Sequence, residues 1–262
     1  MIPQDAIAHW RTVAPWAHDP QVEQDLILSR ALVEIFQEPA LSGALLLRGG
    51  TALHKLCLAP AARYSEDIDL VQAKEGAIGD VIDALRSRLD PFLGRPHRDR
   101  KSKNVILQYR FESEIPPVVP LRLQVEINSR EHFTVFGAVS LPYRVASPWF
   151  TGEAQVGTYA LEELLATKLR ALYQRKKGRD LFDLHLGLRT AGVRPDRILE
   201  AFHVYMDREG SRVSSLEFEG NLDEKLSSGV FGDDIRPLLR PDLHYDPKAA
   251  AAQVREALIR RL

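Results

Sequence analysis

Apolar residues recur with a helical period near the start of the chain and then give way to a strand-like run. Residues 21–37 place apolar side chains three or four positions apart, which predicts a helix that ends before Pro39. Residues 44–48 form a short apolar run that stops at Gly49–Gly50, and helix-forming residues resume over 51–58. This stretch predicts a strand, a tight turn and a helix in succession.

A period of two marks further strands. In residues 105–111 every second side chain is apolar or aromatic, and the same holds for residues 121–128, so each is predicted to bury one face. Residues 65–71 are strand-like in their apolar and β-branched content, and residues 78–89 carry a helical pattern.

The pattern beyond Gly157 is helical. It covers residues 161–175, 180–189, 195–208 and 249–262. We therefore expect an α/β (α+β) domain with a mixed sheet in residues 1–155 and an all-helical domain in residues 156–262, with the boundary near Gly152 to Gly157.

Composition narrows the class of protein. With 45% hydrophobic and 27% charged residues, the sequence is typical of a soluble globular protein. The single cysteine, Cys57, excludes an intramolecular disulfide, and no apolar run approaches the ~20 residues that span a bilayer. A start without a basic stretch and apolar run is unlike a secretory signal, so we expect a cytoplasmic protein with no membrane partner.

Two carboxylates dominate the candidate chemistry. Because strand side chains alternate, Ser65, Asp67 and Asp69 are expected on one face of their strand. Neighbouring like charges repel unless a cation lies between them, and Mg²⁺ (or Mn²⁺) shared with a triphosphate is a common solution. The alternative is an ordinary acidic pair at a strand end or in a surface loop.

The glycine turn upstream supports the first interpretation. Gly49 and Gly50 allow close backbone approach, and the helix that follows them favours an anion such as phosphate, to which Thr51 adds a hydroxyl or a helix cap. Glu126, on the polar face of the 121–128 strand, is a candidate third metal ligand. The alternatives are a plain tight turn and the solvated face of an edge strand.

A lysine inside an apolar helical stripe gives a third signal. Lys168 lies among Leu161, Leu164 and other leucines on a helical wheel, so its ammonium needs an anionic partner, such as a triphosphate, or must extend to the surface. Just downstream, Asp180 and Asp183 lie one helical turn apart with Arg179 beside them, although Asp180 could equally be a helix N-cap.

Local clusters of basic residues are the remaining feature. The net charge is −1, so no overall basic field marks a nucleic-acid binder. The two clusters, which are either solvated surface or contacts to phosphate, are Arg95, Arg98, Arg100, Lys101 and Lys103 in one segment and Arg175, Lys176, Lys177 and Arg179 in another.

Three motifs together resemble a known family. The segments LLLRGGTAL, RYSEDIDL and ELLATKLRALYQRKKGRDLFDL, within about residues 20 to 190, resemble the AbiEii-type nucleotidyltransferase toxins of bacterial type IV toxin–antitoxin systems, which have a polymerase-β-like nucleotidyltransferase fold. The interval from Gly50 to Asp67 is longer than in the tightest form of the general signature.

The resemblance assigns roles to individual residues. It implies Asp67 and Asp69 as metal ligands, Lys168 facing the nucleotide, and Asp180 or Asp183 as a required acid. Residues implied in nucleotide binding are Gly49, Gly50, Thr51, Ser65 and Arg179, and Ser65 matches a serine that an antitoxin phosphorylates in some members.

The resemblance also implies a function. The expected toxin transfers NMP from an NTP to the 3′ end of a tRNA and is restrained by a cognate antitoxin. Arg48, Arg63 and the segment from Arg95 to Lys103 would then contact RNA phosphates. The alternatives are transfer to a protein or small-molecule hydroxyl, and a catalytically dead module that binds a nucleotide or a partner.

Overall fold

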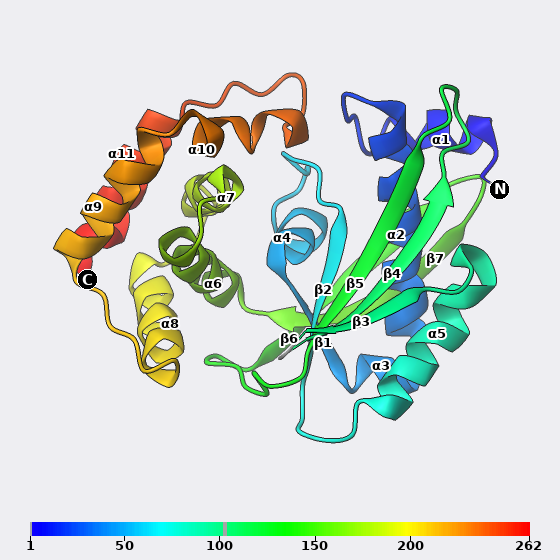
Figure 1. Cartoon of the computed structure of the whole chain (residues 1–262), viewed down its shortest axis with the longest axis horizontal. Coiled ribbons are helices and arrows are strands. Elements are labelled where there is room, and N and C mark those ends of the chain that lie inside the picture. The colour runs from blue at the N-terminus through cyan, green and yellow to red at the C-terminus, as the bar shows by residue number, and fades with distance from the viewer. Residues whose placement is uncertain (1, 102–103) are drawn as a thin grey trace. The chain divides into compact units, whose positions relative to one another are not determined.

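The computed structural model describes residues 2–101 and 104–262 (Figure 1). The chain divides into two compact units. Unit 1 comprises the residues up to Thr134 together with Ala138–Tyr159, and unit 2 comprises Val135–Gly137 and Ala160–Leu262. The boundary expected near Gly152 to Gly157 falls inside the last strand of unit 1, which continues to Tyr159.

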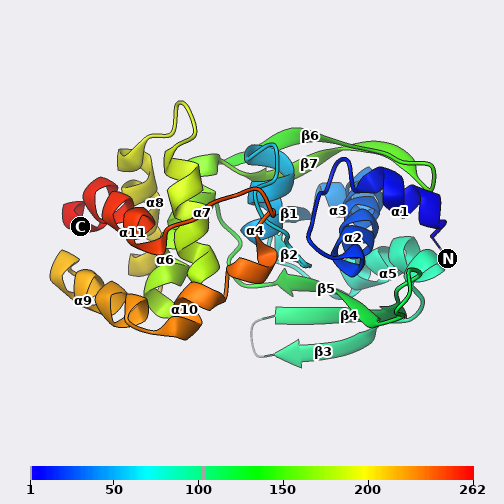
Figure 2. The same ribbon diagram turned by 90° about the horizontal axis from the view of Figure 1, so that it is seen from above.

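A mixed sheet forms the framework of unit 1, as the sequence predicts. Its described residues form seven strands in the order β3–β4–β5–β2–β1–β7–β6, and only the β2–β5 and β1–β7 pairs are parallel. Figure 2 shows β3, β4 and β5 side by side, and β6 next to β7. The strands are β1 (Leu45–Arg48), β2 (Asp67–Gln72), β3 (His97–Lys101), β4 (Asn104–Glu112), β5 (Pro120–Asn128), β6 (Ala138–Ala146) and β7 (Thr151–Tyr159).

Helices pack against the apolar side of this sheet. α2 contacts β2, β5, β6 and β7, and α5 contacts β4 and α2 (Figure 1). Ile68 on β2 and its partner Val125 on β5 are fully buried, whereas Asp67 and Asp69 on β2 are only half-buried. The helical elements of unit 1 are α1 (Gln4–Trp10), α2 (Asp19–Gln37), α3 (Pro39–Ser42), α4 (Gly49–Ala52), the π-helical turn η1 (Leu53–Cys57) and α5 (Gly79–Leu93).

The β6–β7 hairpin was not predicted, because its residues resemble breakers of structure. Pro142 lies in β6, which is an edge strand and needs no ladder hydrogen bond on its outer side. Gly152 lies in β7 where a Cβ would come within 2.9 Å of Val33 on α2, so close packing excludes a side chain there. The glycine therefore marks a close approach to a helix and not the domain boundary.

Other differences are smaller. The predicted strand at residues 65–71 begins at Asp67, so Ser65 precedes it, and the helix expected from Thr51 begins at Gly49. Within the basic segment, residues 97–101 form β3, while residues 102 and 103 lie outside the described residues.

Unit 2 is helical, as predicted, and contains two helices that the pattern did not reveal, α9 and α10. Its elements are α6 (Leu161–Gln174), α7 (Gly178–Leu188), α8 (Pro195–Arg208), α9 (Ser215–Leu226), α10 (Gly229–Asp233), α11 (Pro247–Ala257) and the short 3₁₀ turns η2 (Arg236–Leu238) and η3 (Ile259–Arg261). In the described part of the chain, no helix combines the length and the apolar character that crossing a membrane requires.

Glu163 fastens the short segment 135–137 to the helices of unit 2. Its fully buried carboxylate accepts hydrogen bonds from the backbone N–H of Val135 at 2.8 Å and of Phe136 at 3.1 Å, and from the Tyr205 hydroxyl at 2.9 Å. A buried carboxylate needs such donors because it has lost its water. The segment, α6 and α8 are thereby joined through one side chain.

A buried carboxylate also organises the N-terminal helices of unit 1. Asp25 on α2 is fully buried and accepts hydrogen bonds from Nε1 of Trp10 at 2.8 Å and of Trp16 at 3.0 Å. Lys55 in η1 approaches the same carboxylate at 2.6 Å and also donates to Ser29 at 3.1 Å. Burial opposes the charged form of Lys55, but attraction by Asp25 raises its pKa. The network joins α1, α2 and η1.

Replacing Asp25 tests this network. Asp25→Ala leaves the Lys55 ammonium and two indole N–H groups without their acceptor, so we expect the free energy of unfolding to fall by about 3–5 kcal/mol. Urea denaturation followed by tryptophan fluorescence measures the change. Asp83→Ala, at an exposed position of α5, is the matched control and should stay within about 0.5 kcal/mol of the wild type. Equal stability of the two variants would contradict the role of Asp25.

Candidate active site

Two carboxylates project from one face of β2, as the alternation predicts. Asp67 and Asp69 are half-buried, while Ile68 and Leu70 on the opposite face are buried. Their Cα atoms are separated by about 7 Å, the length of two strand residues. The pair concentrates negative charge in the middle of the sheet, since β2 lies between β1 and β5.

Strand register brings a cation and a third carboxylate to Asp69. Arg48, the last residue of β1, is directly opposite Asp69 in the antiparallel pair. Glu126 on β5 is opposite Asp69 in the parallel pair, and Gln124 is opposite Asp67. Partners in register share a face of the sheet, so these polar side chains gather around Asp69.

The donor set suits a hard divalent cation only in part. Mg²⁺ is commonly held by one or two carboxylates together with phosphate oxygens of the substrate, and Asp67 and Asp69 fit that requirement. Glu126, the candidate third ligand, accepts hydrogen bonds from Nδ2 of Asn104 and, at 3.4 Å, from Nε2 of Gln124. In the part of the chain that the structure describes, no group of three acidic, histidine or cysteine side chains is arranged to hold a metal.

Gly49 and Gly50 are both required because side chains of the protein pack against their Cα atoms. Gly49 has φ +77°, and a Cβ there would overlap the carboxylate of Asp69. A Cβ at Gly50 would overlap the guanidinium of Arg63. The close approach expected of these glycines is therefore made to side chains of the protein itself, and bare backbone lies beside Asp69.

Arg63 does not have the role proposed from the sequence. Only 2% of its surface is exposed, and Nη1 donates to the carbonyl of Tyr64 at 2.9 Å. Such a buried guanidinium supports the turn at Gly50 and cannot reach RNA phosphates. Arginine is usually exposed, and nothing in the local sequence marks Arg63 as buried.

Thr51 and Ser65 fasten the loop before β2 to α4. The Thr51 hydroxyl donates to the carbonyl of Asp67 at 2.5 Å and lies 2.9 Å from Oγ of Ser65. Thr51 is fully buried, and Arg48 is the N-cap of α4, so of the two roles considered for Thr51 the helix cap is excluded. The two hydroxyls hold the start of β2, and with it Asp67, against the glycine turn.

Arg48 has a carboxylate partner that the sequence did not reveal. Its Nη1 is 2.5 Å from Oε2 of Glu131, which follows β5. Burial disfavours the charged guanidinium, but attraction by Glu131 and Asp69 raises the pKa of Arg48. Arg48 is thus engaged with two carboxylates of unit 1, whereas the sequence suggested an RNA contact. Pairing across 83 residues leaves no local signal that could have identified Glu131.

Lys168 of unit 2 lies inside the helical core, as its place in the apolar stripe predicts. It is 6% exposed and forms ion pairs with Asp180 at 3.2 Å and Asp183 at 2.9 Å, both fully buried on α7. Arg175 donates two hydrogen bonds to Asp180, at 2.7 and 2.8 Å. The inward lysine is therefore paired with anions of the chain and does not extend to the surface.

The charges around Asp180 determine its ionisation. Burial disfavours its carboxylate, but Lys168 and Arg175 lower the pKa of Asp180 below its usual value. Asp180 lies within the first turn of α7, whose N-cap is Lys177, so the N-cap alternative was wrong. Arg179 approaches Asp234 through its backbone N–H at 3.4 Å and its Nε at 3.8 Å. Arg175, placed by the sequence only in a basic cluster, is the guanidinium that binds Asp180.

Comparison with known proteins relates this arrangement to a family. The family model of the nucleotidyl transferase AbiEii toxin of type IV toxin–antitoxin systems matches residues 30–258. No curated protein matches the sequence.

Solved structures share the fold. The chain is similar to MenT4, a nucleotidyltransferase toxin from Mycobacterium tuberculosis, with a TM-score of 0.66 and 18% identity over 98% of this chain and 88% of that one. It is also similar to JHP933 from Helicobacter pylori, with a TM-score of 0.56 and 16% identity over 92% of this chain and 90% of that one. Because the family match spans most of its length, the chain belongs to the AbiEii nucleotidyltransferase toxins of type IV toxin–antitoxin systems.

Proposed function

We propose that this toxin transfers NMP from an NTP to an RNA hydroxyl, that the acceptor is the 3′ end of tRNA, and that the product blocks translation. The observation that carries the proposal is the pair Asp67 and Asp69 on one face of β2, beside the bare backbone of Gly49. In this proposal the toxin acts in the cytoplasm, where tRNA is found, and a cognate antitoxin restrains it.

The reaction exchanges a phosphoanhydride bond of the NTP for a phosphodiester bond to the RNA. The acceptor oxygen attacks the α-phosphorus and forms a new P–O bond, the bond to the β-phosphate breaks, pyrophosphate leaves, and the hydroxyl proton passes to solvent. Mg²⁺ or Mn²⁺, when bound, supplies Lewis-acid stabilisation of the phosphoryl oxygens. Asp67 and Asp69 would hold that cation, and Arg48 limits the repulsion at Asp69.

Lys168 is paired with two aspartates, and its charge also suits a triphosphate. Its ammonium group supplies the cation that would neutralise a triphosphate. The same group forms the ion pairs with Asp180 and Asp183 that connect α6 to α7. Arg175 also pairs with Asp180, so Lys168 is not the sole cation on that carboxylate. We propose that Lys168 neutralises charge on the triphosphate. Asp180 and Asp183 hold the lysine side chain in place within unit 2.

Exposed arginines of β3 and the preceding loop are proposed to bind the RNA backbone. Arg95 and Arg98 are exposed, and β3 is an edge strand of the sheet. Arginine contacts to phosphate release counterions, so their contribution weakens as salt rises.

Neutralising the two carboxylates tests the transferase assignment. With α-labelled NTP, Mg²⁺ and total tRNA, we expect the wild type to label tRNA and Asp67→Asn and Asp69→Asn to lose at least about a hundredfold in rate, because oriented charge is worth that much in active sites. Asp83→Asn, exposed on α5, should label tRNA normally. Label on protein or a small molecule instead would reject the RNA acceptor and retain the transferase; full activity of both variants would reject the site.

The ionisation of Asp180 predicts how stability depends on pH. Its lowered pKa means that its contribution is present above its unfolded pKa of about 3.9 and is lost as pH falls through the lower folded value. Asp180→Asn should therefore be about 3 kcal/mol less stable than the wild type at pH 7, and the gap should narrow below about pH 4. Denaturation curves at pH 7, 5 and 3 measure it, with Asp207→Asn on the exposed face of α8 as control. A gap that stays constant over this range contradicts a buried Asp180 anion.

Salt dependence tests the RNA-binding arginines. For the Arg95→Ala, Arg98→Ala double variant, the slope of log Kd for tRNA against log salt concentration should fall by about 2, one for each phosphate contact. Arg144→Ala, exposed on the opposite edge strand β6, is the matched control and should keep the wild-type slope. Identical slopes for all three proteins would exclude β3 as the RNA contact.

A further inference from the structure

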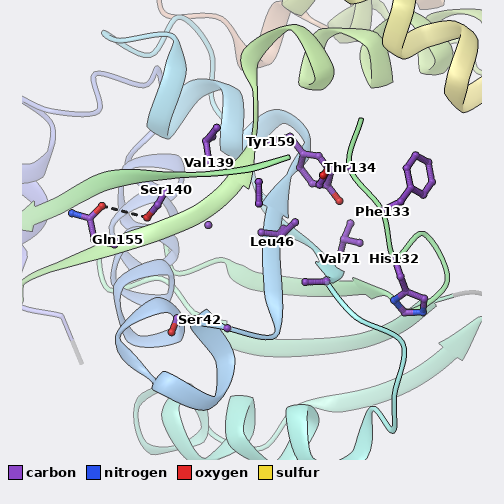
Figure 3. A pocket seen from close by; sticks show the side chains of 14 residues that line it. Ser42, Leu46, Val71, His132, Phe133, Thr134, Val139, Ser140, Gln155 and Tyr159 are labelled. Atoms are coloured by element: carbon purple, nitrogen blue, oxygen red, sulfur yellow. Dashed lines mark hydrogen bonds between the residues drawn. The ribbon is translucent and has the colours of Figure 1, made fainter. Parts of the chain in front are cut away.

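A cavity of about 580 Å³ opens on the same face of the sheet as Asp67 and Asp69 (Figure 3). Its floor includes Leu46 on β1 and Val71 on β2, which pair with each other in register. Arg48 and Asp69 form the pair two residues further along the same strands, about 7 Å away. The cavity and Asp69 therefore occupy neighbouring positions on one face, and Asp67 lies two residues further along β2.

The lining of the cavity is aromatic and hydrogen-bonding, and it includes the imidazole of His132. Phe133 and Tyr159 supply two rings, and Ser140 and Gln155 supply polar groups from β6 and β7, as Figure 3 shows. None of the described residues that line it is an aspartate, glutamate, lysine or arginine. Such a surface suits a planar, uncharged group with donors and acceptors at its edge, and it does not suit a phosphate.

The wall that carries Phe133 is fixed before any ligand binds. Oδ1 of Asn128 accepts hydrogen bonds from the backbone N–H groups of Arg130 and Glu131, at 2.9 and 3.0 Å. Glu131 is paired with Arg48, and Nδ1 of His132 lies 2.8 Å from the carbonyl of Gln72. A preorganised wall lowers the entropic cost of binding. The pair between Glu131 and Arg48 also links this wall directly to the residue opposite Asp69.

We propose that this cavity binds a nucleoside, the base with its ribose, whose phosphate lies at Asp67 and Asp69. The inference rests on the proposed nucleotidyl transfer, which places a phosphate at those carboxylates. Two sources share the chemistry: the incoming NTP, and the last nucleotide of the RNA acceptor. Aromatic rings beside a base and hydroxyl or amide groups at its edge are the means by which proteins bind nucleobases outside a duplex.

Binding of free nucleosides tests the cavity without requiring catalysis. Saturation-transfer NMR with adenosine, guanosine, cytidine and uridine should give a signal from at least one with the wild-type protein. Ser140→Leu fills the cavity from β6 and should abolish that signal. Ala146→Leu adds the same side chain at an exposed position near the other end of β6, outside the lining, and should keep it. No signal from any nucleoside, or equal signals from the two variants, overturns the proposal.

Kinetics then identify the source of the nucleoside. Phe133→Ala removes one ring, so KM should rise about tenfold for the substrate whose base occupies the cavity, with a smaller change in kcat. A rise in KM for NTP assigns the incoming nucleotide, and a rise in KM for tRNA assigns the acceptor. Unchanged KM for both overturns the proposal even where wild-type transfer is normal, whereas wild-type protein that binds nucleosides but transfers no label counts against the proposed function alone.

Discussion

The two carboxylates on one face of β2 determine which charged side chains must lie near this strand. Asp67 and Asp69 repel each other across about 7 Å, and a fold that places them in the middle of a sheet must supply positive charge nearby. The antiparallel register of β1 with β2 does so by setting Arg48 opposite Asp69. Arg48 also pairs with Glu131, so the attraction of one guanidinium is shared between Asp69 and Glu131. Strand register therefore decides which charged side chains face one another around Asp69.

The periodicity of apolar residues correctly predicted side-chain directions within single strands and helices. The alternation in β4 and β5, the shared face of Asp67 and Asp69, and the inward position of Lys168 all follow from side-chain direction along one element. Partners could not be predicted in the same way. Arg48 meets Glu131 only because β1, β2 and β5 are neighbours, and Arg175 reaches Asp180 across the break between two helices. Register and helix packing are long-range properties, and one sequence carries little trace of them.

Unexpected close packing explains why the predictions for Arg63 and Gly152 were wrong. Arg63 belongs to a class of residue that is usually exposed, yet the empty space above Gly50 lets its guanidinium lie inside the fold. Gly152 was expected at the domain boundary, but it lies inside β7, where an added Cβ would overlap the side chains of Val33 on α2 and of Phe150. In both cases the glycine is needed because a neighbouring side chain packs directly against its Cα. The ammonium groups of Lys55 and Lys168, one in each unit, both lie against aspartate carboxylates that offset the loss of water.

The hydrogen bonds from Val135 and Phe136 to Glu163 limit where the chain can be cut into independent fragments. Between β5 and β6 the backbone leaves unit 1 for three residues, binds Glu163 through two amides, and returns to form the hairpin. Neither unit is therefore a contiguous segment, and a fragment that starts at Ala160 lacks two of the donors that its first helix requires. Recombination or truncation at the end of the sheet would separate a carboxylate from its donors. Gene fusions and insertions should accordingly preserve the stretch from β5 to α6 as one inherited block.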